Sequence, residues 1–151
     1  MKVADVLKRK GAVVVTIKPT DTMADLSALL RERRIGAIVV SSDGHTIEGV
    51  ISERDLAYAL AVHKTDLPGM PVSALMTKAV ITCAPGDDIA LVGSTMMSRS
   101  IRHIPVEQQS RLVGMVSIRD VLNLRVDDLQ QQSAQLRSFV AEIDRPPQDR
   151  D

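Results

Sequence analysis

The stretch Gly114-Met-Val-Ser-Ile-Arg-Asp120 decides how the rest of the chain is interpreted. An apolar run ends on Ser117 and passes directly into a helix-forming segment, which indicates a strand that turns into a helix. Backbone N–H groups and the positive end of the helix dipole meet at such a junction, so it suits an anion such as phosphate. The same pattern occurs at Gly49-Val-Ile-Ser-Glu-Arg-Asp55, with Gly, Ser, Arg and Asp in matching places. Two copies of one junction indicate an internal repeat.

Other landmarks recur at nearly the same distance. Pro85 corresponds to Pro19 and Asp120 corresponds to Asp55, and the separations within these two pairs differ by a single position. Apolar periodicity predicts strands at 13–17, 37–40 and 47–51 in the first copy and at 80–82, 101–106 and 112–116 in the second. A repeat of this length that mixes strands and helices predicts two βαββα units of an α/β (α+β) fold. Each unit is too small to bury a core that would make it stable alone, so we expect the two units to pack as a pseudo-two-fold pair.

The expected domains are a first repeat at 1–66, a connector at 67–70, a second repeat at 71–124, a C-terminal helix extension at 125–144 and a disordered tail at 145–151. In the last helix, apolar residues step alternately by four and three with one polar interruption, namely Leu122, Val126, Leu129, Ser133, Leu136, Val140 and Ile143. This heptad pattern is typical of helix packing. It predicts either a helix that covers its own domain or a helix–helix contact between subunits.

Composition excludes several classes of function. Aromatic residues make up 1% of the chain, too few for binding nucleic acid by base stacking. The 19 acidic and 19 basic residues balance, so neither nucleic acid nor an anionic membrane is an expected partner. The single cysteine, Cys83, excludes an internal disulfide and is expected in the core. With no apolar signal segment and no run near the ~18 apolar residues of a membrane span, we expect a cytoplasmic protein.

Neither a catalytic centre nor a metal site is expected. His103, Ser117 and Asp120 are the residue types of a hydrolase triad, but no Gly-x-Ser-x-Gly elbow surrounds the serine, and the first copy has Ala37 in place of the histidine. The three histidines are scattered without the spacing of metal ligands. The chain also contains no Gly-x-Gly-x-x-Gly or Walker A loop.

Two βαββα units that each end on Gly-h-h-Ser-x-Arg-Asp resemble a tandem pair of CBS domains, the Bateman module, from Val3 to about Leu124. The resemblance, to a stand-alone bacterial-type pair, implies a non-catalytic sensor. Its ligand would be an adenosine compound (AMP, ADP, ATP, NAD or S-adenosylmethionine) held without a metal in clefts between the domains. The resemblance also implies a homodimer and an effector protein of unknown identity. A structural adaptor with degenerate ligand sites is the alternative.

The resemblance also implies which residues bind the ligand. The family's ribose-binding carboxylate falls on Asp55 and Asp120, and its hydroxyl near the phosphate falls on Ser52 and Ser117. The start of each first strand is expected to line the adenine pocket, with aliphatic side chains clamping the base. The full set of expected binding residues is Thr16, Ile17, Lys18, Ile38, Ser52, Arg54, Asp55, Thr82, Arg102, His103, Ile104, Met115, Ser117, Arg119 and Asp120.

Two points about these junctions stay open. Ser-x-x-Asp is also a helix capping box, so both aspartates can serve simply to cap a helix. The copies also differ, because the second carries Arg102 and His103 where the first has Gly36 and Ala37. Our hypothesis from the sequence is that the Asp120 site binds more tightly, with the arginine and histidine reaching the phosphates.

Overall fold

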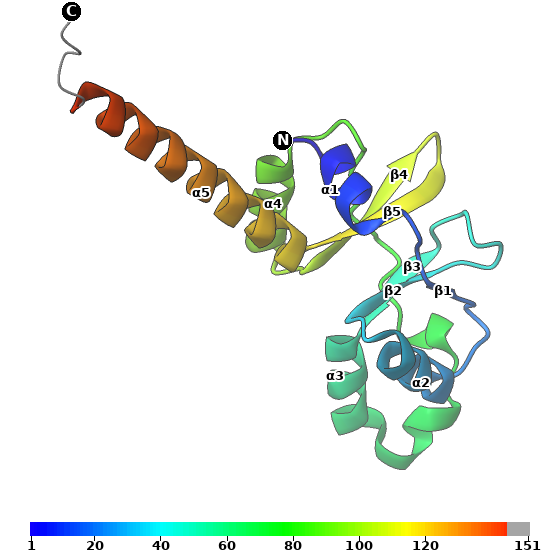
Figure 1. The fold of residues 1–151 in the computed structure, drawn as a ribbon. Coiled ribbons are helices and arrows are strands. Elements are labelled where there is room, and N and C mark those ends of the chain that lie inside the picture. Colours follow the sequence, from blue (N-terminus) through cyan, green and yellow to red (C-terminus); the bar gives the residue numbers. More distant parts are fainter. Residues whose placement is uncertain (145–151) are drawn as a thin grey trace, which may run out of the picture.

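The computed structural model describes residues 1–144, so the tail expected at 145–151 lies outside the described residues. Its elements are α1 (Val3–Lys10), β1 (Thr16–Ile17), α2 (Met23–Arg33), β2 (Ala37–Val40), β3 (Gly49–Ser52), α3 (Glu53–His63), the 3-10 helices η1 (Lys64–Gly69) and η2 (Val72–Ala74), α4 (Ile89–Arg99), β4 (His103–Gln108), β5 (Arg111–Ser117) and α5 (Ile118–Ile143). The structure has two lobes, each built mainly from one repeat, and α5 extends away from the second lobe (Figure 1). The expected mixed fold of two repeats and a long last helix is confirmed.

The two sheets repeat the same pairing. In the first, β1 runs parallel to β2 and β2 pairs antiparallel with β3, whereas the second contains the antiparallel pair β4 and β5. Ile17 pairs with Val40 in the first sheet, and Cys83 forms a parallel bridge with Val106 beside the second. Cys83 follows Ile17, and Val106 follows Val40, at the separation that also relates the two prolines, Pro19 and Pro85. The sequence repeat is therefore also a repeat of strand pairing.

The first strand of each repeat is shorter than expected. The strand predicted at 13–17 is reduced to Thr16–Ile17, and the one predicted at 80–82 does not form. In the second repeat the cause is Pro105, because a proline has no N–H to donate to a neighbouring strand. The bonds that remain are at Cys83, whose N–H donates to the carbonyl of Pro105 at 3.1 Å and whose carbonyl accepts from Glu107 at 2.8 Å.

Each repeat has its own apolar core, but the opening segments are exchanged. Val3 and Val6 of α1 pack into the core formed by α4, β4, β5 and the start of α5. Leu67 and Val72, which follow α3, pack into the core of the first repeat. Cys83 lies in the second core, as expected, where burial raises the pKa of its thiol to about 11. The exchange means that each sequence repeat supplies a piece of the other packing unit.

The start of α5 packs on the second repeat, and the rest of the helix does not cover the protein. Val121 and Leu124 are buried, whereas the apolar heptad residues from Leu122 to Ile143 are between 49% and 66% exposed. The interpretation that this heptad pattern covers its own domain is therefore wrong, because the patterned face points away from the lobe. Within residues 1–144, none of the helices combines the length and apolar character needed to cross a membrane.

Candidate functional site

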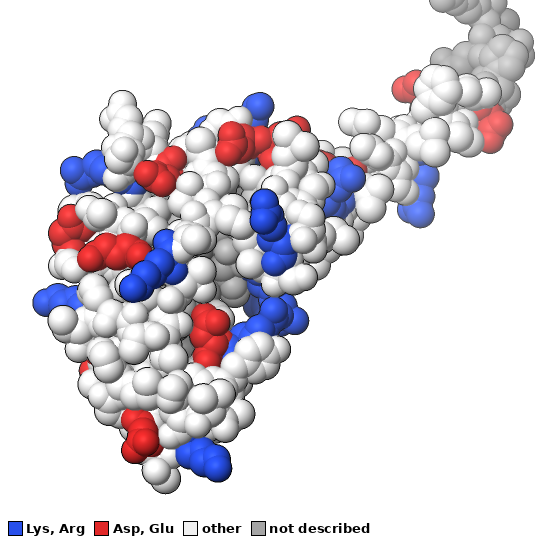
Figure 2. Space-filling view, turned by 180° about the vertical axis from the view of Figure 1, so that it is seen from behind, with Lys and Arg blue, Asp and Glu red and all other residues white. Residues whose placement is uncertain are grey.

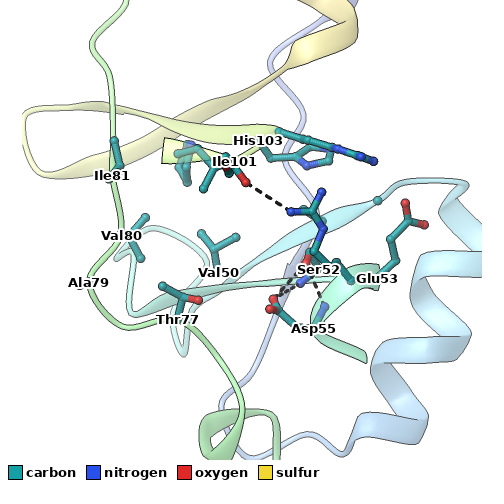
Figure 3. Close-up of a pocket in the computed structure, with 16 residues that line it drawn as sticks. Val50, Ser52, Glu53, Asp55, Thr77, Ala79, Val80, Ile81, Ile101 and His103 are labelled. Carbon is teal, nitrogen blue, oxygen red and sulfur yellow. Dashed lines mark hydrogen bonds between the residues drawn. The ribbon is translucent and has the colours of Figure 1, made fainter. Parts of the chain in front are cut away.

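A cleft of about 260 Å³ lies between the two repeats, and we refer to it as the inter-repeat cleft. Its volume is near the lower end of the range for small-molecule pockets, about 300 Å³. The lining residues come from the edges of β2, β3 and α3 in one lobe and from the segments before α4 and around the start of β4 in the other (Figure 3). They are Gly36, Ala37, Val50, Ser52, Glu53, Arg54, Asp55, Thr77, Ala79, Val80, Ile81, Ser100, Ile101, Arg102, His103 and Pro105.

The inter-repeat cleft has an apolar side and a polar side. Val50, Val80 and Ile81 stand together on one side, while Glu53 and His103 lie on the other (Figure 3). The apolar side is held in place by the backbone, because the N–H groups of Val50 and Thr77 donate to each other's carbonyls at 3.0 and 2.9 Å. A ligand with one flat apolar part and one charged part matches this division.

Asp55 lies at the start of α3, between those two sides. Its Oδ2 accepts hydrogen bonds from the backbone N–H of Ser52 at 2.8 Å and from the Ser52 hydroxyl at 3.0 Å. The Ser52 Oγ accepts in turn from the Asp55 N–H at 3.3 Å, so the capping box predicted from the sequence is confirmed. Among residues 1–144, no group donates to Asp55 Oδ1. The carboxylate therefore caps its helix and keeps one oxygen available to the cleft.

Two arginines border the polar side. The guanidinium of Arg54 spans the lobes, since its Nη1 donates to the carbonyl of Ser100 at 3.3 Å. Arg102 is fixed through its backbone, whose carbonyl accepts from the N–H of Ile118 at 2.8 Å, and the residue lines the cleft. Arg54 lies in the first turn of α3, where the helix dipole also favours an anion.

His103 completes the polar side. Burial, and then the positive charge of Lys10, hold the pKa of this imidazole below its ordinary value, against the opposing carboxylates of Glu53 and Asp120. The imidazole is therefore mainly neutral near pH 7 and is poised to gain a proton when an anion binds beside it. Gly36 leaves room for the imidazole ring, because a Cβ at position 36 would lie only 3.2 Å from His103 Cε1.

The second junction has the same cap but a different neighbour. Asp120 Oδ2 accepts from the Ser117 N–H at 2.8 Å and from its hydroxyl at 3.0 Å, and it also contacts Lys10 Nζ at 2.7 Å. Burial raises the pKa of Asp120, but the hydrogen bonds from Lys10 and Ser117 outweigh it and lower the value overall. Asp120 does not line the inter-repeat cleft.

At the first junction, the position equivalent to Lys10 is occupied by a small residue, Ala79. Leu7 of α1 lies against Gly114 in the same way that Met76 lies against Gly49. Three residues after each of these side chains come Lys10 and Ala79, respectively. Ala79 lines the inter-repeat cleft, whereas Lys10 forms an ion pair with the aspartate of its junction. One junction is thus open to a ligand where the other holds a lysine.

The inter-repeat cleft gathers part of the expected binding set. It contains Ser52, Arg54, Asp55, Arg102 and His103. The remaining expected residues lie elsewhere, namely Thr16, Ile17, Lys18, Ile38, Thr82, Ile104, Met115, Ser117, Arg119 and Asp120. Three of these, the isoleucines expected to clamp the base, belong to the two apolar cores.

Sequence reasoning missed the apolar side of the cleft. This side is formed by Val50 and by the segment Thr77, Ala79, Val80 and Ile81. The sequence contained a signal for this side, because these small and branched residues lie between the second opening turn and Thr82, which was expected to line the adenine pocket. Their importance depends on the missing strand at 80–82, which leaves the segment free to line the cleft.

Acidic and basic side chains are interspersed over the face seen in Figure 2. Across residues 1–144, no cluster of three or more His, Cys, Asp or Glu side chains is arranged to hold a metal ion.

Comparisons with known proteins agree with the repeat and the fold. The sequence profile of the CBS domain matches residues 3–62 and 72–127. The crystal structure of a CBS-domain containing protein from Agrobacterium tumefaciens is 36% identical, with a TM-score of 0.80 over 83% of this chain and 99% of that chain. The CBS domain-containing protein YhcV of Bacillus subtilis is 28% identical over 121 residues, which is 80% of this chain and 83% of the relative.

A more distant structure shows the same fold. The CBS domain pair of protein MJ0100, crystallised in complex with 5′-methylthioadenosine and S-adenosyl-L-methionine, is 23% identical. It aligns with a TM-score of 0.75 over 85% of this chain and 98% of that chain. The two profile matches cover most of the sequence, one in each repeat. This chain therefore belongs to the CBS domain family and carries two CBS domains in tandem.

Proposed function

We propose that this protein is a regulatory module that binds one adenosine-containing ligand per chain in the inter-repeat cleft. The observation that carries the proposal is the division of the cleft into an apolar side and a polar side bordered by two arginines, with the Asp55 carboxylate between them. An adenosine phosphate has the same three parts in the same order. Its flat base would lie among Val50, Val80 and Ile81, its ribose near Asp55, and its phosphate on the polar side.

The ribose would be recognised by Asp55. Its Oδ1, which accepts no hydrogen bond from residues 1–144, can accept from a ribose hydroxyl while Oδ2 keeps the helix cap. Hydrogen bonds to a charged group contribute about 1.5–3 kcal/mol. The sequence predicted ribose binding at both aspartates, with the tighter site at Asp120. We propose the Asp55 site alone, because Arg102 and His103 line the cleft that contains Asp55.

The phosphate would interact with Arg54, Arg102 and His103. Both arginines carry fixed positive charge at any physiological pH. The backbone N–H groups at the start of α3 add to the favourable potential, although the one on Glu53 already donates to the carbonyl of Gly36 at 2.9 Å. An adenosine ligand that carries a phosphate should therefore bind more tightly than adenosine itself.

The relatives support this class of ligand. Both molecules in the MJ0100 complex contain the adenosine group that the proposed site would recognise. AMP, ADP, ATP and NAD contain it as well, and the phosphate-binding groups favour these over the uncharged nucleoside. We propose that the ligand regulates an effector protein rather than undergoing a reaction. The Asp120 junction, which is closed by Lys10, would have only a structural role.

A thermal-shift panel tests the proposal. Protein stripped of bound ligand would be heated with AMP, ADP, ATP, NAD, S-adenosylmethionine and adenosine, with GTP as the control for a non-adenine nucleotide. A ligand at a hundredfold excess over its dissociation constant stabilises the folded state by about 2.7 kcal/mol, or about 5–10 °C for a chain of this size. Shifts with one or more adenosine compounds and none with GTP are expected. No shift with any of them would favour the adaptor alternative.

A further inference from the structure

The exposed part of α5 is a second surface that the proposed ligand site does not explain. The family match ends at residue 127, whereas the helix continues to Ile143. Beyond the match α5 extends outward from the second lobe (Figure 1). Its apolar heptad residues, which we name the α5 seam, are Leu122, Val126, Leu129, Leu136, Val140 and Ile143. An exposed apolar row of this length on a solvent-facing helix indicates a contact surface.

The heptad positions specify what kind of partner fits the α5 seam. The pattern places Leu122, Leu129 and Leu136 at d positions, with Val126 and Val140 at a positions. β-branched residues at a with leucine at d favour two parallel helices over three or four. The seam extends over three heptads, which is about 33 Å of helix. A second helix with the same pattern meets these requirements, and another copy of this chain supplies it.

The contacts of α5 with its own lobe leave the seam free. Val121 and Leu124 are buried against the lobe, and Asp127 forms an ion pair with Arg9 of α1 at 2.6 Å. These residues occupy the c, f and b positions, on the side of the helix opposite a and d. In a two-stranded coiled coil this side faces away from the partner. Two copies can therefore pair along α5 with both lobes on the outside.

The residues beside the seam are compatible with parallel pairing. In that arrangement each g residue approaches the e residue five positions further along the partner helix. The pairs formed are Arg125 with Gln130 and Gln132 with Arg137, and neither places like charges together. The carboxylates of this part of α5, which would repel one another across a seam, occur instead at b and c positions.

We propose that two copies of this chain form a parallel two-stranded coiled coil through the α5 seam. This inference rests on three observations: the α5 seam is exposed, Val and Leu occupy its a and d positions, and it points away from the lobe. It does not depend on the proposed ligand. Ser133, the one polar a residue, would face its own copy in the partner and favour the aligned register. The dimer would hold two inter-repeat clefts, one in each chain, at one end of a rod.

Sedimentation equilibrium of the full chain tests the proposal. A dimer is expected, and Leu136→Asp should raise its dissociation constant at least about a hundredfold, because it places two carboxylates in the buried seam. The matched control is Gln131→Asp, which adds the same charge at the exposed f position and should leave the dimer unchanged. Circular dichroism of the heated proteins confirms that the lobes of both variants remain folded. A monomeric parent, or a dimer that Leu136→Asp does not weaken, would overturn the proposal.

Cysteine crosslinking tests the direction of the helices. In a parallel pair each Val140 meets its own copy, so Val140→Cys should form a disulfide-linked dimer on mild oxidation. The parent protein is the control, because its native Cys83 is buried and should not form a disulfide between chains. In an antiparallel pair a residues face d residues, so the two copies of residue 140 do not meet. A stable dimer in which Val140→Cys does not crosslink would therefore contradict the parallel arrangement.

Discussion

The junctions at Asp55 and Asp120 are alike in their backbone and unlike in what surrounds them. In both, the aspartate Oδ2 accepts from a serine N–H at 2.8 Å and from the serine hydroxyl at 3.0 Å. Yet one carboxylate lines a cleft, whereas the other forms an ion pair with Lys10 at 2.7 Å. The Ser-x-Arg-Asp motif therefore determines the local cap. Residues far away in the sequence decide whether the carboxylate faces the cleft or an ion-pair partner.

Exchange of the opening segments produces this difference. Because α1 packs on the second repeat, its last residue, Lys10, reaches the Asp120 junction. The corresponding segment after η2 packs on the first repeat and brings Ala79 to the Asp55 junction. A methyl group leaves space for a ligand, while a lysine supplies the cation that a carboxylate otherwise lacks. The two repeats can therefore keep one motif and serve different purposes.

The largest expected effect comes from making the first junction resemble the second. Ala79→Lys would place an ammonium group in the inter-repeat cleft within reach of Asp55, where it would fill the space and occupy the carboxylate. Binding of the adenosine ligand found in the panel should weaken at least about a hundredfold, measured by isothermal titration. Thr65→Lys, which adds the same charge at an exposed position outside the cleft, is the control. Undiminished binding to Ala79→Lys would rule out the proposed role of the cleft.

A smaller effect is expected from pH, because His103 lines the inter-repeat cleft beside the proposed phosphate position. Its pKa is below the ordinary value in the free protein, and a bound phosphate would raise it. The complex then takes up a proton, so the affinity for AMP should increase as the pH falls from 8 to 7, above the range near pH 6 in which the phosphate of AMP itself gains a proton. Adenosine, which has no phosphate, serves as the comparison and should show little change. His103→Gln should remove the pH dependence, and its persistence in this variant would assign it to another group.

The smallest effect concerns the closed junction. Removing the ammonium group with Lys10→Met should lower the free energy of unfolding by about 0.5–1 kcal/mol at pH 7, since the lysine is partly exposed. The folded-state pKa of Asp120 is lowered, so this contribution is present above the ordinary aspartate pKa and disappears as the pH falls through the folded value. Urea unfolding of both proteins at pH 7 and pH 3 measures the difference. A destabilisation of equal size at both pH values would show that the ion pair is not its source.

The sequence predicted the features that depend on neighbouring residues. The caps at Ser52 and Ser117 and the strand Ala37–Val40 all occur where the local pattern indicates them. The strand expected at 80–82 failed because of Pro105, a residue that lies beyond the whole of α4 in the sequence and that pairing brings alongside.

Part of the candidate site could not be predicted for a similar reason. The contact between Lys10 and Asp120 joins residues 110 positions apart, and no pattern near either one indicates it. The choice between the two aspartates likewise depends on which opening segment packs on which repeat. The motif identified both candidate carboxylates, and only the tertiary structure distinguishes them.

We propose that one adenosine ligand binds per chain, at Asp55 and not at Asp120. The most direct measurement is isothermal titration of the parent, Asp55→Ala and Asp120→Ala with the adenosine ligand identified in the panel. Because the two aspartates cap their helices with the same geometry, each variant controls for the loss of a cap in the other. We predict one site per chain, weakened about ten- to a hundredfold by Asp55→Ala and changed less than about twofold by Asp120→Ala. Equal binding by the parent and Asp55→Ala, or loss of binding in Asp120→Ala alone, would contradict the account.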